Sequence, residues 1–177
     1  SIVMKKVFFA SLLHMVVLNA QRYEPEWSDL DSRPTPQWFK DAKFGIFIHW
    51  GLYSVPAWGP LGSYAEWYLN GLLNGDTNRI KYHNENYGKD FPYRGFAQLF
   101  NPKKYDPSEW ANLFQMSGAK YVVLTSKHHD GFCLWPSTHS NGYNSFDTPA
   151  KRDLLGDLTK AVKNKGLRSG FYYSLYE

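Results

Sequence analysis

Three runs of apolar residues stand out along the chain, and each is typical of a β-strand. They cover residues 44–50 (FGIFIHW), 121–125 (YVVLT) and 169–176 (SGFYYSLY). The first two are nearly continuous in apolar side chains, which is the pattern of parallel strands that are covered on both faces. The pattern therefore predicts three largely buried strands.

A polar cap followed by an apolar stripe predicts a helix before each of the last two strands. In residues 105–120, Asp106 is the expected N-cap, Pro107 opens the first turn, and Glu109 follows three residues after the cap. The expected stripes and stop signals are Trp110, Leu113, Phe114 and Gly118 in that segment, and Leu155, Leu158, Val162 and Gly166 in residues 152–166. Helices that alternate with strands predict an α/β fold with a parallel sheet.

Residues 52–105 do not follow this alternation. They are rich in Gly, Asn, Tyr and Trp, and they include at least one expected short helix near residues 63–72 (SYAEWYLNGL). Long connections in compact domains are usually functional. This one leaves the C-terminal end of the first strand, which is the side where α/β sheets and barrels bind ligands.

The N-terminus has the organisation of a secretory signal peptide. A basic start, Met4 to Lys6, precedes an apolar run and a small residue, Ala20, at a plausible cleavage point. We expect residues 1–20 to be removed, with residues 1–3 lying upstream of the initiator, and residues 21–177 to form the mature part. A buried helix or a membrane anchor is the alternative, but the run is short for a bilayer span. The expected location is the secretory pathway, lysosomal or extracellular.

Charge and cysteine content narrow the class of protein further. Removing the two lysines of residues 1–20 lowers the formal net charge from +4 to +2, and no Lys/Arg run is present. That balance indicates no nucleic-acid partner. We also expect no membrane attachment once the signal peptide has been removed. Cys133 is the only cysteine, so an internal disulfide is excluded, and its apolar neighbours predict a buried thiol.

Polar and aromatic residues gather where the three predicted strands end. His49 ends the first strand, His128 and His129 follow the second, and Tyr172 and Tyr173 lie on the third. His49, His128, His129 and Asp130 are all metal-ligand types, but they lack H-x-H or H-x-x-x-H spacing, and neighbouring side chains on a strand diverge. No serine elbow and no phosphate-binding glycine loop is present.

The remaining chemistry suits a sugar. Imidazole and carboxylate groups bind hydroxyls, and aromatic faces cover the apolar side of a sugar ring; the aromatic share of this chain is 18%. Sugar hydrolysis usually needs two carboxylates. Glu66, Asp130 and Glu177 are the candidates, although Asp130 precedes a glycine and is foremost a turn residue.

Four stretches closely resemble the N-terminal part of the α-L-fucosidases of glycoside hydrolase family 29. They are WFKDAKFGIFIHWGLYSVPAW, SYAEWYLNG, FNPKKYDPSEWANLFQMSGAKYVVLTSKHHDGFCLWPS and GFYYSLYE, and the match covers about residues 24–177. The resemblance implies a retaining exo-glycosidase that releases terminal α-L-fucose, without a cofactor or metal. It also implies a (β/α)8-like barrel, of which this chain would hold the first three βα units and the long loop after strand one.

The resemblance also implies roles for individual residues. His49, His128 and His129 look like the family's hydroxyl-binding histidines, and Glu66 and Trp67 look like its sugar-contacting pair. Tyr173 matches a family tyrosine, with Tyr172 as an open alternative. We expect both His128 and His129 to reach one sugar because the Asp130-Gly131 turn breaks the strand's alternation. The partner is then a fucosylated glycan, and the full-length protein could form a homo-oligomer.

The resemblance further implies that the nucleophile and the acid/base carboxylate are expected after Glu177, so no catalytic residue is assigned in this chain. We expect a fragment that carries the fucose-binding half and is inactive by itself. A catalytically inactive fucose-binding or scaffold protein of the same family is the alternative function. A metal-dependent barrel hydrolase is the third hypothesis.

Overall fold

The computed structural model describes residues 23–176 in two units, residues 23–36 and residues 37–176. The predicted signal peptide, residues 1–20, lies outside the described residues. The first unit holds one short helix, α1 (Trp27–Asp31), and Arg33 lies over the ring of Tyr23 within this unit. Among the described residues, no helix has the length and apolar character needed to cross a bilayer.

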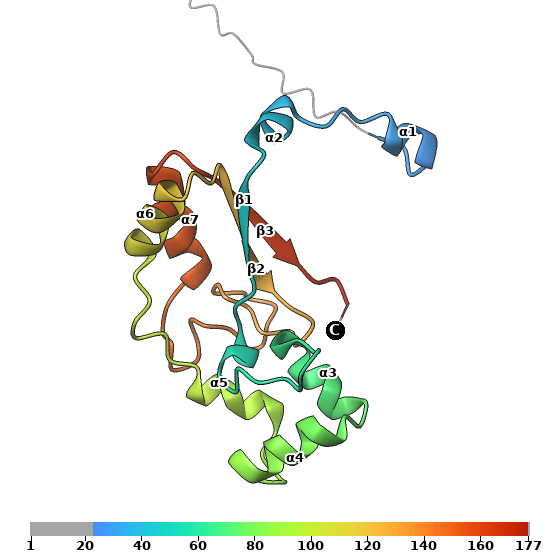
Figure 1. The fold of residues 1–177 in the computed structure, drawn as a ribbon, viewed down its shortest axis with the longest axis vertical. Coiled ribbons are helices and arrows are strands. Elements are labelled where there is room, and N and C mark those ends of the chain that lie inside the picture. Colours follow the sequence, from blue (N-terminus) through green and yellow to red (C-terminus); the bar gives the residue numbers. More distant parts are fainter. Residues whose placement is uncertain (1–22, 177) are drawn as a thin grey trace, which may run out of the picture. The chain divides into compact units, whose positions relative to one another are not determined.

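The second unit contains the sheet, its helices and the long segment that follows the first strand (Figure 1). In chain order its elements are α2 (Gln37–Ala42), β1 (Gly45–Ile48), η1 (Leu52–Ser54), η2 (Ala65–Trp67), α3 (Tyr68–Leu73), α4 (Thr77–Asn86), η3 (Tyr93–Gly95), α5 (Phe96–Leu99), α6 (Pro107–Met116), β2 (Tyr121–Lys127), α7 (Leu154–Asn164) and β3 (Arg168–Tyr173).

The three strands form one parallel sheet in the order β1-β2-β3. Ile48 of β1, Leu124 of β2 and Phe171 of β3 are aligned across the sheet, so the three C-terminal ends reach the same edge. The prediction of an α/β fold with a parallel sheet is confirmed. The described residues contain three strands, which do not close a barrel. The barrel is therefore still an expectation from the family resemblance.

The caps of α6 and α7 follow the sequence signals. The Asp106 carboxylate accepts hydrogen bonds from the backbone N–H groups of Ser108 and Glu109, at 2.8 and 3.0 Å. Gly118 has φ of +86° just after α6, a conformation that glycine adopts without strain. Asp153 caps α7 in the same way, by accepting from the N–H of Gly156. Both helix starts are confirmed.

Each predicted stripe is correct except at one leucine: Phe114 of α6 and Leu158 and Val162 of α7 are buried as predicted. In α6, Leu113 is 64% exposed, whereas Ala111 and Phe114 are buried. In α7 the buried row is Leu154, Leu158 and Val162, and Leu155 is only partly buried. Residues four apart lie on one face of a helix, and this row of α7 faces the sheet, where α7 contacts both β2 and β3.

Helices cover one face of the sheet in the part of the chain that the structure describes. Val122 and Leu124 of β2 meet Leu158 and Val162 of α7 on that face. On the other face the side chain of Phe47 is 52% exposed, and Val123 and Tyr172 are half-buried. The prediction that the strands are covered on both faces is therefore wrong for the described residues.

Residues 52–105 form a second packed region, beyond the strand ends, that contains α3, α4 and α5 (Figure 1). Its core is aromatic, with Tyr68 and Phe96 fully buried and their rings in edge contact at 5.8 Å. Trp50 connects this region to the helix side of the sheet, because its ring contacts both Tyr105 and Trp110. Much of the aromatic content therefore makes core.

Two neighbouring leucines in α7 test this packing. Leu154→Ala should lower the free energy of unfolding by about 2–5 kcal/mol, because a fully buried side chain leaves a cavity. Leu155→Ala should cost clearly less, because Leu155 is only partly buried and its surroundings can relax. Urea denaturation of both variants measures the difference. Equal losses would contradict the observed face of α7.

Candidate functional site

The candidate site begins where β1 leaves the sheet. β1 ends at Ile48, two residues before the predicted limit, so His49 and Trp50 lie beyond the strand. The buried hydroxyl of Thr125 replaces the strand pairing there, accepting from the N–H of Trp50 at 3.0 Å and donating to its carbonyl at 3.1 Å. The side chain of His49 is exposed.

A β-bulge in β2 decides which way the following side chains point. Thr125 pairs with Tyr172, but Lys127 pairs with Tyr173, so Ser126 is the extra residue. The Ser126 hydroxyl donates to the Tyr172 carbonyl at 2.7 Å. Beyond the bulge, Lys127 faces the side of Tyr173, and its Nζ lies 4.7 Å from the centre of that ring.

The bulge therefore places His128 on the side of Tyr172. The His128 ring lies 5.7 Å from that of His49, 5.9 Å from that of Tyr172 and 5.2 Å from that of Tyr53. The alternation breaks at Ser126, inside the strand, and not only at the Asp130-Gly131 turn as predicted. The two histidine rings then lie 4.8 Å apart, so adjacent residues share one site.

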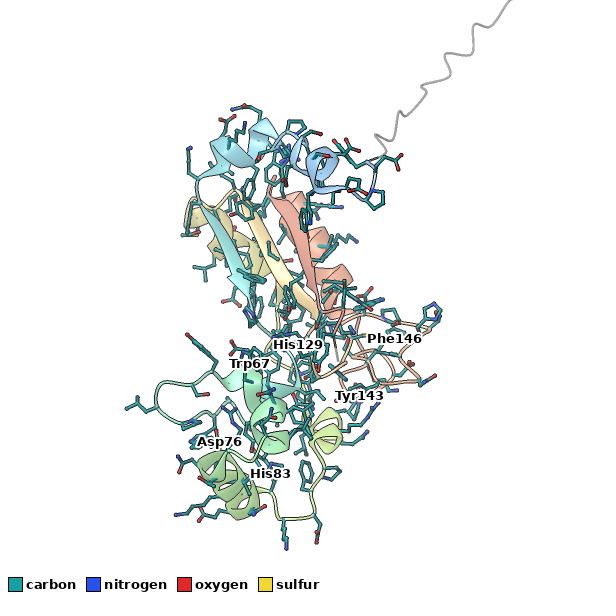
Figure 2. The ribbon with its side chains drawn as sticks, turned by 90° about the vertical axis from the view of Figure 1, so that its right-hand side faces the viewer. Trp67, Asp76, His83, His129, Tyr143 and Phe146 are labelled. Carbon is teal, nitrogen blue, oxygen red and sulfur yellow. The ribbon has the colours of Figure 1, made fainter. Side chains whose placement is uncertain are left out.

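A pocket of about 260 Å³ lies between this histidine pair and the start of α3. Glu66, Trp67, His128 and His129 line it, so four of the six predicted site residues meet there. The Trp67 ring lies 5.6 Å from that of His129, and Figure 2 shows these two side chains near the ends of the strands. Asn70, Asn74, Asp130, Tyr176 and two leucines complete the lining.

His129 is held in one tautomer. Its Nδ1 lies 3.0 Å from the backbone carbonyl of Tyr176 and 2.6 Å from the Ser174 hydroxyl. A carbonyl oxygen only accepts, so Nδ1 carries the proton in the bond to Tyr176. In that tautomer the lone pair is on Nε2, which can accept a hydrogen bond from a ligand hydroxyl.

His128 is buried and uncharged. Burial lowers the pKa of its imidazole to about 4, and the neighbouring His129 and His49 act in the same direction. Its Nδ1 is buried without a hydrogen-bond partner among the described residues. An unpaired buried nitrogen costs free energy, so its presence in a native structure needs an explanation, and a role in ligand binding is one.

Asp130 is a turn residue, as predicted. Its Oδ1 accepts from the N–H of Phe132 at 3.1 Å, and its Oδ2 accepts from the Tyr93 hydroxyl at 2.7 Å. Gly131 follows with φ of +77°. Burial raises the pKa of the Asp130 carboxyl, while these hydrogen bonds favour its ionised form. The carboxylate is therefore engaged in holding the turn.

Tyr173 is separated from the other predicted residues. It lines a different pocket of about 220 Å³, with Lys127, Arg94 and Tyr143. Tyr172 instead has its ring 6.3 Å from His49 and 5.9 Å from His128. The sequence did not decide between the two tyrosines. Which of them shares a side of the sheet with His128 depends on the bulge in β2.

The structure also bears on the predicted thiol, the third candidate carboxylate and the metal alternative. Cys133 is buried, as predicted. Glu177 lies outside the described residues. Within residues 23–176, no three His, Cys, Asp or Glu side chains are close enough to hold a metal ion. Four residues of the site were not predicted: Asn70, Asn74 and Tyr176 line the pocket, and Ser174 bonds His129. Each reaches the site through a tertiary contact, which leaves no signal in the sequence.

The buried imidazole predicts a pH dependence of stability. In the unfolded chain His128 binds a proton near its usual pKa of 6.5, whereas the folded ring stays neutral to about pH 4. The unfolded state binds more protons in that window, so the free energy of unfolding should fall as the pH drops from about 6.5 to 4, by up to about 1.4 kcal/mol per pH unit.

Urea denaturation across this pH range, with His128→Gln and the exposed His139→Gln as a matched pair, isolates this contribution. The slope should flatten only in the His128 variant. An NMR titration of the His128 ring near its ordinary pKa of 6.5 would contradict the burial argument.

Several known proteins are similar to this chain in sequence and in fold. The profile of the family described as Alpha-L-fucosidase matches residues 11–177. The chain is 48% identical to an alpha-L-fucosidase from Dictyostelium discoideum, over 97% of this chain and 38% of that protein. It is also 48% identical to a tissue alpha-L-fucosidase from Rattus norvegicus, over 90% of this chain and 34% of the relative.

A solved structure agrees with both. The crystal structure of Thermotoga maritima alpha-fucosidase in complex with fucose aligns with a TM-score of 0.80 and 52% identity, over 86% of this chain and 37% of that one. The chain thus spans between a third and two fifths of the length of these proteins. Over its matched length, it belongs to the alpha-L-fucosidase family.

Proposed function

We propose that these residues form the fucose-binding part of an alpha-L-fucosidase, an exo-glycosidase that releases terminal α-L-fucose from glycans. The observation that carries the proposal is the pocket in which Glu66, Trp67, His128 and His129 meet. Family membership supports the reaction class. Because the chain spans only part of its relatives, the activity belongs to the longer protein in which these residues lie.

The charges of the pocket favour a neutral, hydroxyl-rich ligand. Its lining includes two carboxylates and two imidazoles, and no lysine or arginine. A phosphate or carboxylate ligand would meet negative charge without a matching cation. Hydroxyl groups suit this lining, since they both donate to carboxylates and neutral imidazoles and accept from amides.

Each residue has a role that its geometry supports. The Nε2 lone pair of His129 and the Glu66 carboxylate accept from sugar hydroxyls. The Trp67 indole, which is 43% exposed, gives an apolar face for the ring. His49 lies beside His128 at the sheet end of the same cluster and contacts a further hydroxyl.

We assign the tyrosine of the site to Tyr172. Its ring belongs to the cluster formed by His49 and His128, whereas Tyr173 lies beside Lys127 in the other pocket. The two tyrosines are neighbours on β3 and point to opposite faces. The bulge at Ser126 is the physical reason for the assignment, because it puts His128 on the side of Tyr172.

The described residues supply binding more than bond cleavage. Retaining hydrolysis uses two carboxyl groups about 5–5.5 Å apart, one of which attacks the sugar. The pocket lining holds Glu66 and Asp130, and the Asp130 carboxylate is engaged by Tyr93 and Phe132. The pocket therefore lacks at least one of the two carboxyl groups, and we propose that the missing group comes from residues other than these and that no cofactor is required.

The partner of the longer protein is a fucosylated glycan, and its route is the secretory pathway. The second point rests on the basic and apolar organisation of residues 1–20. A homo-oligomer is compatible with this assignment.

Removing a hydroxyl-binding imidazole should weaken catalysis in the protein that contains these residues. We expect His128→Ala and His129→Ala each to lower kcat/KM for an aryl α-L-fucoside, corresponding to about 1.5–3 kcal/mol of lost transition-state stabilisation. Steady-state kinetics with purified protein measures the loss.

Two comparisons act as controls. His139→Ala removes an exposed imidazole outside this pocket and should leave kcat/KM unchanged. Tyr172→Phe should cost more than Tyr173→Phe. Unchanged kinetics in both His128→Ala and His129→Ala would refute the binding assignment.

The separation of binding from cleavage gives a further prediction. Purified residues 21–177 should show no turnover of an aryl α-L-fucoside, because only one unengaged carboxylate lines the pocket. The longer protein, assayed in parallel, is the positive control. Fucoside hydrolysis by residues 21–177 that Glu66→Gln abolishes would show that this segment holds its own catalytic group.

A further inference from the structure

Glu66 and Trp67 lie on an element that cannot fix their positions by itself. η2 (Ala65–Trp67) is a single 3-10 turn, and the segment before it has no regular structure. α3, which follows directly, is only six residues long. Short helices are marginal in isolation. Precise placement of the two side chains therefore requires contacts from outside this segment.

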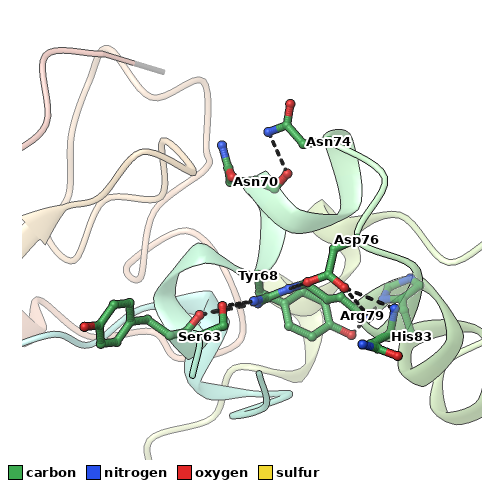
Figure 3. Close-up of polar contacts among 9 residues, drawn as sticks. Ser63, Tyr68, Asn70, Asn74, Asp76, Arg79 and His83 are labelled. Atoms are coloured by element: carbon green, nitrogen blue, oxygen red, sulfur yellow. Dashed lines mark hydrogen bonds and ion pairs between the residues drawn. The ribbon is translucent and has the colours of Figure 1, made fainter. Parts of the chain in front are cut away.

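Arg79 of α4 provides the contact on the N-terminal side. Its side chain is 1% exposed, and its Nη2 donates to the Ser63 hydroxyl at 2.9 Å (Figure 3). Both Nη1 and Nη2 also lie 3.4 Å from the backbone carbonyl of Tyr64. Ser63 and Tyr64 are the two residues immediately before η2. The guanidinium therefore holds the entry to the segment that carries Glu66.

Arg79 is itself fixed in place. Asp76 caps α4 by accepting from the N–H groups of Asn78 and Arg79, both at 3.1 Å, and its Oδ2 accepts from Arg79 Nε at 3.5 Å. The Arg79 side chain passes directly over Gly71, where a Cβ would collide with it. The ring of Tyr68 lies 5.5 Å from the guanidinium carbon. One rotamer of Arg79 is thus selected.

His83, one turn further along α4, provides the contact on the C-terminal side. Its Nε2 lies 2.8 Å from the carbonyl of Phe91, so Nε2 carries the proton. Its Nδ1 then accepts from the Tyr68 hydroxyl at 3.1 Å. Tyr68 follows Trp67 directly in the chain. Two buried polar side chains of α4 therefore bracket the Glu66-Trp67 pair.

We propose that Arg79 is a positioning residue for the fucose site: it sets the place of Glu66 and Trp67 through Ser63 and Tyr64. The proposal rests on the proposed function of that pair. Burying a charged side chain is expensive, and apolar residues usually stabilise a helix interface at lower cost. The partners of Arg79 lie next to the candidate site. Its burial therefore serves to fix the geometry of that segment more than to stabilise the fold. Only a planar, forked donor makes these contacts together.

The test uses the full-length protein with Arg79→Lys, which keeps the charge and removes the fork. We expect about a tenfold lower kcat/KM, the size of one or two lost charge-assisted hydrogen bonds, with a raised KM. Ser63→Ala removes only the 2.9 Å contact and should cost about threefold. It also keeps the proposal testable if Arg79→Lys does not fold.

Arg152→Lys is the matched control. Arg152 also bonds an aspartate, Asp157, and a backbone carbonyl, that of Tyr105, and lies over the Tyr105 ring, but outside the pocket lining. It should lower the melting temperature without lowering kcat/KM. A loss in the Arg79 and Ser63 variants no greater than in Arg152→Lys would overturn the proposal.

A double-mutant cycle separates positioning from general stability. If Arg79 acts through Glu66 and Trp67, the loss from Arg79→Lys should be less than additive with the loss from Glu66→Gln and with that from Trp67→Ala. Full additivity with both would overturn the proposal. If Glu66→Gln and Trp67→Ala both leave the kinetics unchanged, the proposed function of the pair fails.

Hydrogen exchange then decides the positioning role alone: faster exchange at residues 63–68 in Arg79→Lys supports it, and unchanged exchange overturns it.

Discussion

One extra residue in a central strand determines the candidate site. Parallel pairing brings three strand ends to one edge, but pairing alone would direct His128 away from Tyr172. The bulge at Ser126 reverses the alternation, and the Ser126 hydroxyl compensates by bonding the Tyr172 carbonyl. His128 consequently turns towards His49, and Lys127 turns towards Tyr173. Bulges next to active sites commonly redirect side chains in this way.

The region beyond the strands completes the site from the opposite side. Its aromatic core, with Tyr68 and Phe96 at the centre, gives α4 a rigid position. α4 in turn holds the chain on both sides of Glu66 and Trp67 through buried polar contacts. The sheet thus places the histidines, and the long connection places the carboxylate and the indole. The site forms only where these two packed regions meet.

The site keeps groups that are unfavourable for stability. His128 is buried with an unpaired Nδ1, and its imidazole stays neutral because burial disfavours the charged ring. Trp67 exposes much of its indole, and Phe47 is half exposed on the uncovered face of the sheet. Such features are costly in a core and useful in a ligand site, where a bound molecule can cover the rings and bond the polar atoms.

The sequence by itself determined the local structure and the family. Caps at Asp106 and the glycine after α6, the parallel strands and the motif residues were readable because each depends on neighbours in the chain. Tertiary structure decided the rest. It set the buried rows of α6 and α7, left one sheet face open, and chose Tyr172 over Tyr173 for the histidine cluster. The alternation of a strand predicts which way a side chain points only while the pairing stays regular. The bulge at Ser126 arises from pairing with β3, where its partner Tyr172 lies 46 residues later in the chain.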